Sequence, residues 1–224
     1  MLSLDRRVVY LMICLTMRRR KRVKKGAAFL VLVAALVSII APAANAAIAP
    51  SRFSTGIIYY SCTSTNIGGY GSMLDDAVAL WNDGVADYRR CCARNIELVD
   101  NPRQDVTVSF TSPYSDSQVY GRVSLWMLDP DGNGYNLSLG DGLTWEWAFL
   151  YVYPSHVSVA VQTLPEYGYS TADIDDCVLK TAVHEFGHIL GLGHDRETVM
   201  IQGLSNMYEP SATNFSDLHT IWCS

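Results

Sequence analysis

The chain from 184 to 195 reads His184-Glu185-Phe186-Gly187-His188-Ile189-Leu190-Gly191-Leu192-Gly193-His194-Asp195. On a helix, His184 and His188 leave the same face one turn apart, so both imidazoles can reach one ion. Gly191 can take a positive φ and end that helix, which brings His194 to the ion from another direction. Three imidazoles with one open position are typical of catalytic rather than structural zinc, with Zn–N distances of about 2.0–2.1 Å.

Glu185 follows the first histidine directly, too close along the chain to bind the same ion easily. Its carboxylate is placed instead to take a proton from a water on the metal, as a general base does. An ordinary helix can carry two histidines and a glutamate at this spacing by chance. Here three of the five histidines fall in register with the glutamate and a glycine, so we expect these three to bind zinc. The other two, His156 and His219, are expected to be surface or structural residues.

This segment resembles the zinc signature of the metzincin metallopeptidases. The run His-Glu-Phe-Gly-His-x-Leu-Gly-Leu-x-His is most similar to the matrixin branch, and Asp195 after the third histidine is similar to the adamalysin branch. Metzincins carry a methionine turn beneath the metal, and Thr198-Val199-Met200 fits it. The resemblance implies that Met200 packs under the site without binding the ion. It also implies an α+β fold with a twisted mixed β-sheet, an active-site helix and a small C-terminal subdomain.

The remaining segments predict the elements of such a fold. Apolar and alternating runs predict strands at 56–60, 96–98, 105–110, 122–127, 148–153 and 156–162. Helical spacing of apolar residues predicts helices over 73–88 and 214–222. A third helix is expected to open at Ser170, with Asp173 in a capping-box arrangement, and to carry the histidine motif.

The order of elements before the histidines also resembles matrixin catalytic domains. It consists of a first strand, a helix bearing Trp81 and a strand of the form Asp-x-x-Val-x-Phe, and the match covers the N-terminal half of those domains. In metzincins an edge strand above the site binds the substrate backbone by strand addition. The sequence leaves open which of the expected strands does so here.

The first 46 residues read as an export signal. A basic cluster over 18–25 precedes an apolar run over 27–40, and Ala-Asn-Ala at 44–46 is a cleavage motif of A-x-A type. Met17, just before the basic cluster, is a candidate for the true start. A membrane anchor is the alternative, but the apolar run is shorter than the ~20 residues that a span needs. We therefore expect a secreted catalytic domain over 47–224, with no stable membrane association after cleavage.

Removing this leader changes the charge of the chain. Nine of the 17 basic and one of the 22 acidic residues fall in the leader, which leaves eight basic and 21 acidic residues and a net charge of −13. An acidic domain is a poor partner for nucleic acid, which argues against an RNA-binding role for the basic cluster. The remaining 178 residues suit one domain with its own core. We expect a monomer that acts on a protein or peptide substrate.

A second metal is one interpretation of the segment from 129 to 134. Asp129, Asp131 and Asn133 place oxygen ligands at alternate positions with a glycine at the sixth, as at the opening of a calcium loop. The twelfth position is a glycine rather than a glutamate, and Asp141 comes one place later. A simple turn rich in Asp, Asn and Gly is the alternative. The histidines that hold the structural zinc of matrixins are missing, so we expect a single zinc.

Five cysteines remain after the leader, an odd count that leaves one thiol over. Cys177 lies seven residues before His184, which on a helix is ~10 Å and too far for a fourth ligand. We expect two disulfides, Cys62 with Cys91 or Cys92, and Cys177 with Cys223.

Together these features predict a secreted zinc-dependent endopeptidase with Glu185 as its general base. A zinc-bearing domain that binds or supports structure without hydrolysis is the alternative from another class. A membrane-tethered peptidase with an uncleaved leader is a further alternative. The intact base, next to the first of the three expected ligands, favours hydrolysis.

Overall fold

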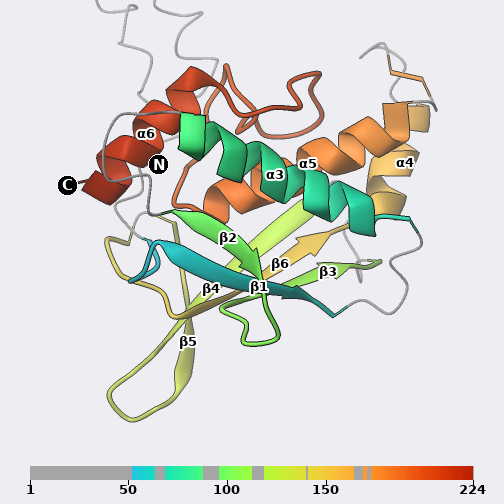
Figure 1. The fold of residues 1–224 in the computed structure, drawn as a ribbon. Helices are drawn as coiled ribbons and strands as arrows, with labels where there is room; N and C mark the ends of the chain where they lie inside the picture. The colour runs from blue at the N-terminus through green and yellow to red at the C-terminus, as the bar shows by residue number, and fades with distance from the viewer. Residues whose placement is uncertain are drawn as a thin grey trace, which may run out of the picture. The chain divides into compact units, whose positions relative to one another are not determined.

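The computed structural model describes residues 52–63, 69–87, 96–112, 119–139, 141–163, 169–170 and 173–223. All of them belong to one compact unit, 45–224. Within them the chain has an α+β fold with four helices and a six-stranded mixed sheet (Figure 1). The predicted leader and Met17 lie outside the described residues, as do Cys91 and Cys92. None of the helices in the described ranges is long and apolar enough to span a membrane.

The sheet has the strand order β2-β1-β3-β6-β4-β5. Four neighbouring strands run parallel, namely β2 (Glu97–Asp100), β1 (Ile57–Cys62), β3 (Val106–Phe110) and β6 (Trp147–Val152). Strand β4 (Gly121–Leu128) runs antiparallel to β6. A parallel sheet with one reversed strand near its edge is a common mixed arrangement.

The last strand covers only half of β4. Strand β5 (Gly134–Leu137) forms a hairpin with β4 and pairs with it from Leu125 to Leu128. The part of β4 from Gly121 to Ser124 therefore has no strand partner on its outer side among the described residues. We call this part the free edge of β4. Its unpaired backbone groups can accept an added strand.

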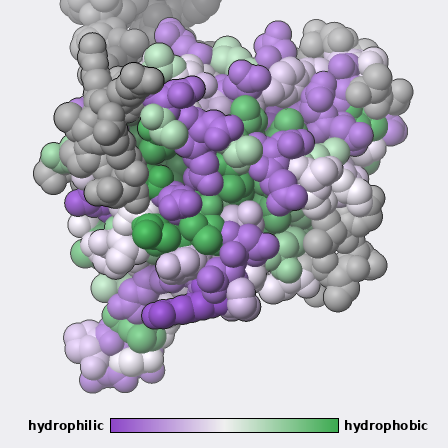
Figure 2. Space-filling model, viewed as in Figure 1, coloured by the Kyte–Doolittle hydropathy of each residue, from purple (hydrophilic) through white to green (hydrophobic). Residues whose placement is uncertain are grey.

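The helices lie together on one side of the sheet (Figure 1). They are α3 (Gly71–Asp87), α4 (Pro154–Thr163), α5 (Ile174–Ile189) and α6 (Ala212–Cys223). Helix α3 buries one stripe at helical spacing, which includes Leu74, Ala77 and Trp81. Figure 2 accordingly shows hydrophilic side chains gathered over α3, and hydrophobic ones where the helices meet the sheet.

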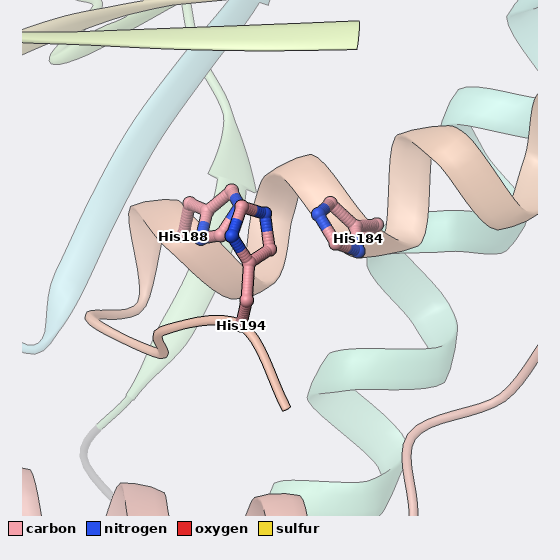
Figure 3. Close-up of side chains that lie close together, drawn as sticks. All are labelled: His184, His188 and His194. Atoms are coloured by element: carbon pink, nitrogen blue, oxygen red, sulfur yellow. The ribbon is translucent and has the colours of Figure 1, made fainter. Parts of the chain in front are cut away.

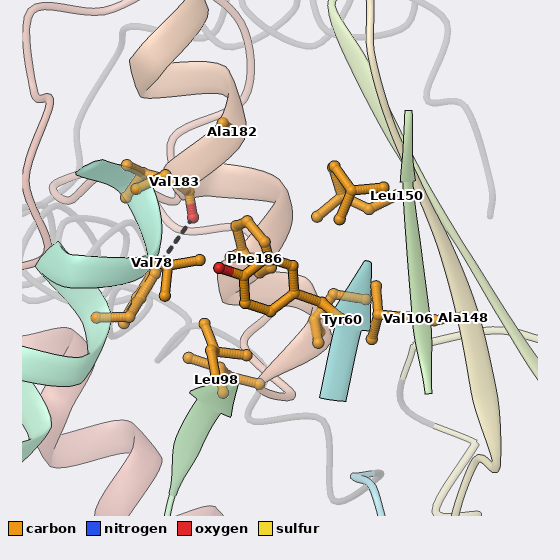
Figure 4. Close-up of a cluster of buried hydrophobic side chains, with 14 of the residues drawn as sticks. Tyr60, Val78, Leu98, Val106, Ala148, Leu150, Ala182, Val183 and Phe186 are labelled. Carbon is orange, nitrogen blue, oxygen red and sulfur yellow. Dashed lines mark hydrogen bonds between the residues drawn. The ribbon is translucent and has the colours of Figure 1, made fainter. Parts of the chain in front are cut away.

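The core lies between the sheet and the helices α3 and α5 (Figure 4). Val106, Val108 and Phe110 alternate into it along β3, as the sequence predicts. Phe186 of α5 is fully buried, and its ring meets that of Tyr60 edge-on at 5.9 Å between centroids.

One expected strand is wrong. Residues 156–162 are part of the helix α4. Pro154 occupies the first helical position, where its fixed φ suits a helix and its missing N–H costs nothing. The carbonyl of Tyr153 then accepts the N–H groups of His156 and Val157. The helical spacing of buried Val157, Ala160 and Val161 was the signal that a strand prediction overlooked.

The start of α5 also differs from the prediction. The helix begins at Ile174 with Asp173 as the residue before it, and not at Ser170. The Asp173 carboxylate accepts hydrogen bonds from the backbone N–H and the hydroxyl of Ser170. It makes no capping bond to its own helix. The two residues form a local turn that leads into the helix.

The expected disulfides are wrong. Cys62 and Cys177 are free, whereas Cys223 is in a disulfide. Trp222, beside Cys223, donates its Nε1–H to the carbonyl of Leu190 at the C-terminal end of α5. Cys177 lies 13 residues earlier on the same helix, ~20 Å away. Disulfides need Cα atoms within about 7 Å, so these two cysteines cannot pair.

Tryptophan indoles join α5 to two other helices. Trp81 of α3 donates its Nε1–H to the Val183 carbonyl at 2.9 Å and is 1% exposed, whereas Trp222 is only partly buried. We expect Trp81→Phe to lower the free energy of unfolding by about 1–3 kcal/mol, because it removes a buried hydrogen bond and leaves a small cavity.

Trp222→Phe is the matched control, since it removes the bond to the Leu190 carbonyl in a more solvated place. Denaturant titration of the two variants measures both losses. If Trp222→Phe lowers the free energy of unfolding as much as Trp81→Phe or more, the larger contribution expected of the α3–α5 hydrogen bond is contradicted.

Candidate metal centre

Three histidines converge at the C-terminal end of α5. His184 and His188 project from the helix, and His194 approaches from the chain that follows it (Figure 3). One ring nitrogen of each lies within 4.8 Å of the others, and the Nε2 atoms of His188 and His194 are 3.2 Å apart. Two nitrogens on one tetrahedral zinc ion would be about 3.3–3.4 Å apart, so this separation fits a shared ion. We call the three residues the histidine cluster. Among the described residues, it is the one group of three or more His, Cys, Asp or Glu side chains that could hold a metal ion.

Backbone carbonyls orient two of the three rings. The Nδ1 atom of His184 lies 3.0 Å from the carbonyl oxygen of Val199, and that of His188 lies 2.8 Å from the carbonyl oxygen of Leu192. A carbonyl can only accept, so each Nδ1 carries the proton and donates it. Both Nε2 atoms are therefore left with a lone pair that points into the cluster, which is the arrangement that a metal-binding histidine needs.

Burial keeps the rings in this neutral form. It lowers the pKa of His184 to about 2 and that of His188 to about 4, and it also lowers the pKa of the more exposed His194. The imidazoles can therefore bind a metal ion without first losing a proton.

The turn after the helix confirms the prediction for Gly191. Its φ is +99°, a conformation that favours glycine. The Gly191 N–H bonds to the His188 carbonyl, and the Leu192 N–H bonds to the Gly187 carbonyl, so the turn closes the end of α5. The same Leu192 offers its own carbonyl to the His188 ring. Ending the helix and orienting a ligand are thus done by one turn.

Met200 is fully buried and follows Val199, whose carbonyl contacts the His184 ring. A Cβ at Gly187 would lie 2.3 Å from the Met200 sulfur, so Met200 packs on α5 at the one position without a side chain. The resemblance implies a packing role for Met200, whereas no residue pattern singles out Gly187. Helix α5 and the segment around Met200 approach each other through this pair.

A hydrogen-bond network fixes the turn that carries Met200. The carboxylate of Asp195 accepts the N–H groups of Glu197 and Thr198 and the Thr198 hydroxyl. The Thr198 oxygen in turn accepts the Met200 N–H at 3.1 Å and the side-chain amide of Asn214 at 2.8 Å. Asp195 therefore acts on the turn and not on the metal. Asn214, on α6, is a supporting residue that no motif indicated.

Glu185 lines the same cleft as the histidine cluster but is not one of the group that could hold a metal. It is 5% exposed, and burial raises its pKa to about 8 against the opposing effect of Lys180. A Cβ at Gly121 would lie 2.6 Å from Oε1 of Glu185 and 2.8 Å from Thr181. Only glycine lets the free edge of β4 approach the carboxylate this closely, and no sequence motif indicates Gly121.

A cleft of about 450 Å³ brings these groups together. One wall is the free edge of β4 and the other is α5 with the segment after Met200. Its lining includes the histidine cluster, Glu185, Gly121, Arg122, Val123, Lys180, Gln202 and Gly203, and the end of the β5 hairpin at Leu137, Ser138 and Leu139.

The predicted calcium ligands lie elsewhere, in the exposed turn between β4 and β5. The carboxylate of Asp129 accepts the N–H groups of Asp131 at 2.9 Å and Asn133 at 2.7 Å, and the Asn133 amide at 3.2 Å. These bonds, led by the backbone of Asn133, lower the pKa of Asp129. Gly132 takes a φ of +83°. This geometry has the features of the Asp-Asn-Gly turn, and calcium binding there stays a prediction.

The two remaining histidines lie apart from the cluster. His156 on α4 has its Nδ1 at 2.9 Å from the carbonyl oxygen of Val119. His219 lies on α6 with a buried Nδ1 that has no hydrogen-bond partner in the described part of the chain. His156 provides a matched control for the ligands.

Neither a scan against protein-family models nor a search of curated proteins finds a match to this chain. The assignment of a function therefore depends on the geometry of the cleft.

The cluster predicts one divalent transition metal per chain. We expect titration with Co²⁺ to saturate at one equivalent and to give the visible absorption bands of a tetrahedral site. His188→Ala should weaken binding at least about 100-fold, since it removes a ligand and the partner of the Leu192 carbonyl. His156→Ala should leave it unchanged. Unaltered affinity in the His188 variant would contradict the ligand assignment.

Lys180 predicts a pH dependence of stability. Burial lowers its pKa from 10.5 to about 8, so between these pH values the unfolded chain binds more protons than the folded one. The free energy of unfolding should therefore rise with pH across this window, by up to about 3 kcal/mol for this group. Denaturant titrations at pH 7.5 and 10.5 in chelator, for the chain and for Lys180→Met, isolate the effect by subtraction. Equal pH dependence in both proteins would contradict it.

Proposed function

We propose that the chain is a zinc-dependent endopeptidase of the metzincin type. One observation supports the proposal most directly. A single cleft contains three imidazoles with converging lone pairs and the Glu185 carboxylate, which is not part of the histidine cluster. Among divalent metals, three neutral imidazoles with an open fourth position suit zinc best. The match of the segment 184–195 to the metzincin signature, and the packing of buried Met200 against Gly187 of the same helix, support the family assignment.

The residues divide the work of peptide hydrolysis. Zinc held by the histidine cluster would polarise a water molecule and the peptide carbonyl as a Lewis acid. Glu185 accepts the proton of the attacking water, because its carboxylate lies in the same cleft and makes no hydrogen bond that would occupy it among the described residues. Burial raises its pKa in the protein alone, and a divalent cation held by the cluster would lower that pKa again and favour the ionised carboxylate. It then returns the proton to the nitrogen of the leaving amine as the C–N bond breaks. The proton is thereby conserved within the site.

The free edge of β4 is the part of the cleft that fits a peptide backbone. Gly121, Arg122 and Val123 line the cleft, and no other described strand pairs with the outer side of β4 from Gly121 to Ser124. An extended substrate can add to this edge with main-chain hydrogen bonds, which favours proteins and peptides as substrates. Glu185 touches the strand at Gly121, so a bound backbone would pass beside the base.

Export is part of the proposal and depends on the sequence. The basic cluster over 18–25, the apolar run and the A-x-A motif at 44–46 favour a cleaved signal and an extracellular enzyme. Mass spectrometry of the chain recovered from the culture medium should find a start near Ala47. A full-length chain that stays with the membrane fraction would favour the tethered alternative instead.

Glu185→Gln tests the proposed mechanism. The variant keeps the shape of the side chain and all three histidines, so it should bind one equivalent of metal as before. Hydrolysis of casein should fall by about 10²–10⁴ in kcat/KM, since the amide cannot accept the proton. Glu197→Gln, which changes an exposed glutamate on the nearby loop, should keep full activity.

Two results would count against the proposal. Undiminished turnover by the Glu185 variant would remove the role of the base. Metal binding without hydrolysis of casein or of a peptide library by the unaltered chain would favour a zinc-bearing domain that does not hydrolyse its partner.

A further inference from the structure

Lys180 is a buried cation in the wall of the cleft. It lies on α5 one turn before His184, is 2% exposed, and lines the cleft with Gln202 and Gly203. It is also the only lysine of the 178 residues that follow the predicted leader. Burying an ammonium group is costly unless hydrogen bonds and an opposite charge compensate it. The groups around Lys180 therefore show how far the protein itself compensates the free energy of burying this charge.

The protein meets that cost only in part. The Nζ atom donates to the carbonyl oxygen of Ile201 at 2.9 Å and to that of Gly203 at 2.6 Å. An ammonium group has three N–H donors, and the described residues show no acceptor for the third. The carboxylate that acts on Lys180 is that of Glu185, and no hydrogen bond joins the two. One N–H donor of the ammonium group is therefore left for an acceptor in the cleft.

The two bonds that exist fix where this charge lies. They tie the segment after Met200 to α5, so Lys180 and Gln202 belong to one wall opposite the free edge of β4. Gly203, at a φ of +90°, turns the chain at the end of this wall. Because two hydrogen bonds hold its Nζ atom, Lys180 keeps its positive charge at a defined position in the cleft wall. The pKa of about 8 leaves it largely protonated at pH 7.

We propose that Lys180 is a specificity-determining residue that binds an acidic side chain of the substrate next to the scissile bond. A substrate carboxylate would supply the acceptor for the third N–H, in a charge-assisted hydrogen bond. The amide of Gln202 in the same wall can donate to the second carboxylate oxygen. This inference rests on the proposed peptidase function.

A purely structural role for Lys180 leads to a different expectation. If the lysine only ties Ile201 and Gly203 to α5, its loss lowers stability and the activity on all peptides to the same degree. A specificity role changes the ratio of activities between peptides that differ in one charge. Arg122 is the other cation in the lining of the cleft and provides the matched control.

The experiment compares pairs of peptides that differ only in Glu or Gln at one position. A peptide library digested by the zinc-loaded protein first identifies the position. We expect the unaltered protein to prefer Glu over Gln there by about 10–100-fold in kcat/KM, the range of one charge-assisted bond. Lys180→Met should cleave the Gln peptide and lose the preference. Lys180→Arg should keep it, and Arg122→Gln should keep it as well.

The outcomes separate the two proposals. If the zinc-loaded protein cleaves no peptide, the proposed function fails. If it cleaves peptides with no acidic preference at any position, the function stands and the role of Lys180 is overturned. A preference that survives in Lys180→Met, or that disappears only in Arg122→Gln, also overturns it. Co²⁺ binding and thermal melting of each variant check the fold, and the library result for the unaltered protein decides even if Lys180→Met does not fold.

Discussion

The burial of α5 is the constraint on which the rest of the structure depends. From Lys180 to Ile189 every residue of the helix is buried, including five that carry polar or charged groups into the cleft. Buried polar groups must find partners, and the segment that follows the helix provides them through the carbonyls of Val199 and Leu192. The hydrogen-bonding needs of the buried helix thus determine the path of the chain that completes the histidine cluster.

Glycine is what allows the surrounding elements to come this close. At Gly187 the helix meets the Met200 sulfur, and at Gly121 the strand β4 meets the Glu185 carboxylate. A methyl group at either place would lie less than 3 Å from its neighbour. These two contacts determine how closely the segment around Met200 and the strand β4 pack against α5. They leave the Nε2 atoms of the cluster and one carboxylate facing the same space, which is what a metal-assisted hydrolysis requires.

The sheet gives the cleft its second property. Because β5 pairs with β4 only from Leu125 onward, the outer edge of β4 is free beside Glu185 and is covered by β5 farther along the strand. Exposed strand edges are usually protected, because they attract other strands. Here the unprotected part is short and lies at the site. In the proposed peptidase, this edge would orient the substrate backbone, and Lys180 in the facing wall would read one of its side chains.

The sequence by itself predicted the convergence of the three histidines and the class of the fold. The spacing of His184, His188 and Gly191 predicts the convergence, because helical periodicity and the conformational freedom of glycine are local properties. The strands with clear alternation, such as the one containing Val106 and Val108, are confirmed for the same reason. Short or weakly patterned segments were missed: β5 was not predicted, and α4 was mistaken for a strand.

Only the tertiary structure decided how distant segments meet. Nothing near Gly121, Lys180 or Asn214 in the chain indicates that they support the site, because their partners lie from 16 to 64 residues away. The disulfide prediction failed for the same reason, since α5 separates Cys177 from the C-terminal end by its own length. Local sequence can specify a helix face and a turn, whereas contacts across the cleft depend on how the sheet and the helices pack.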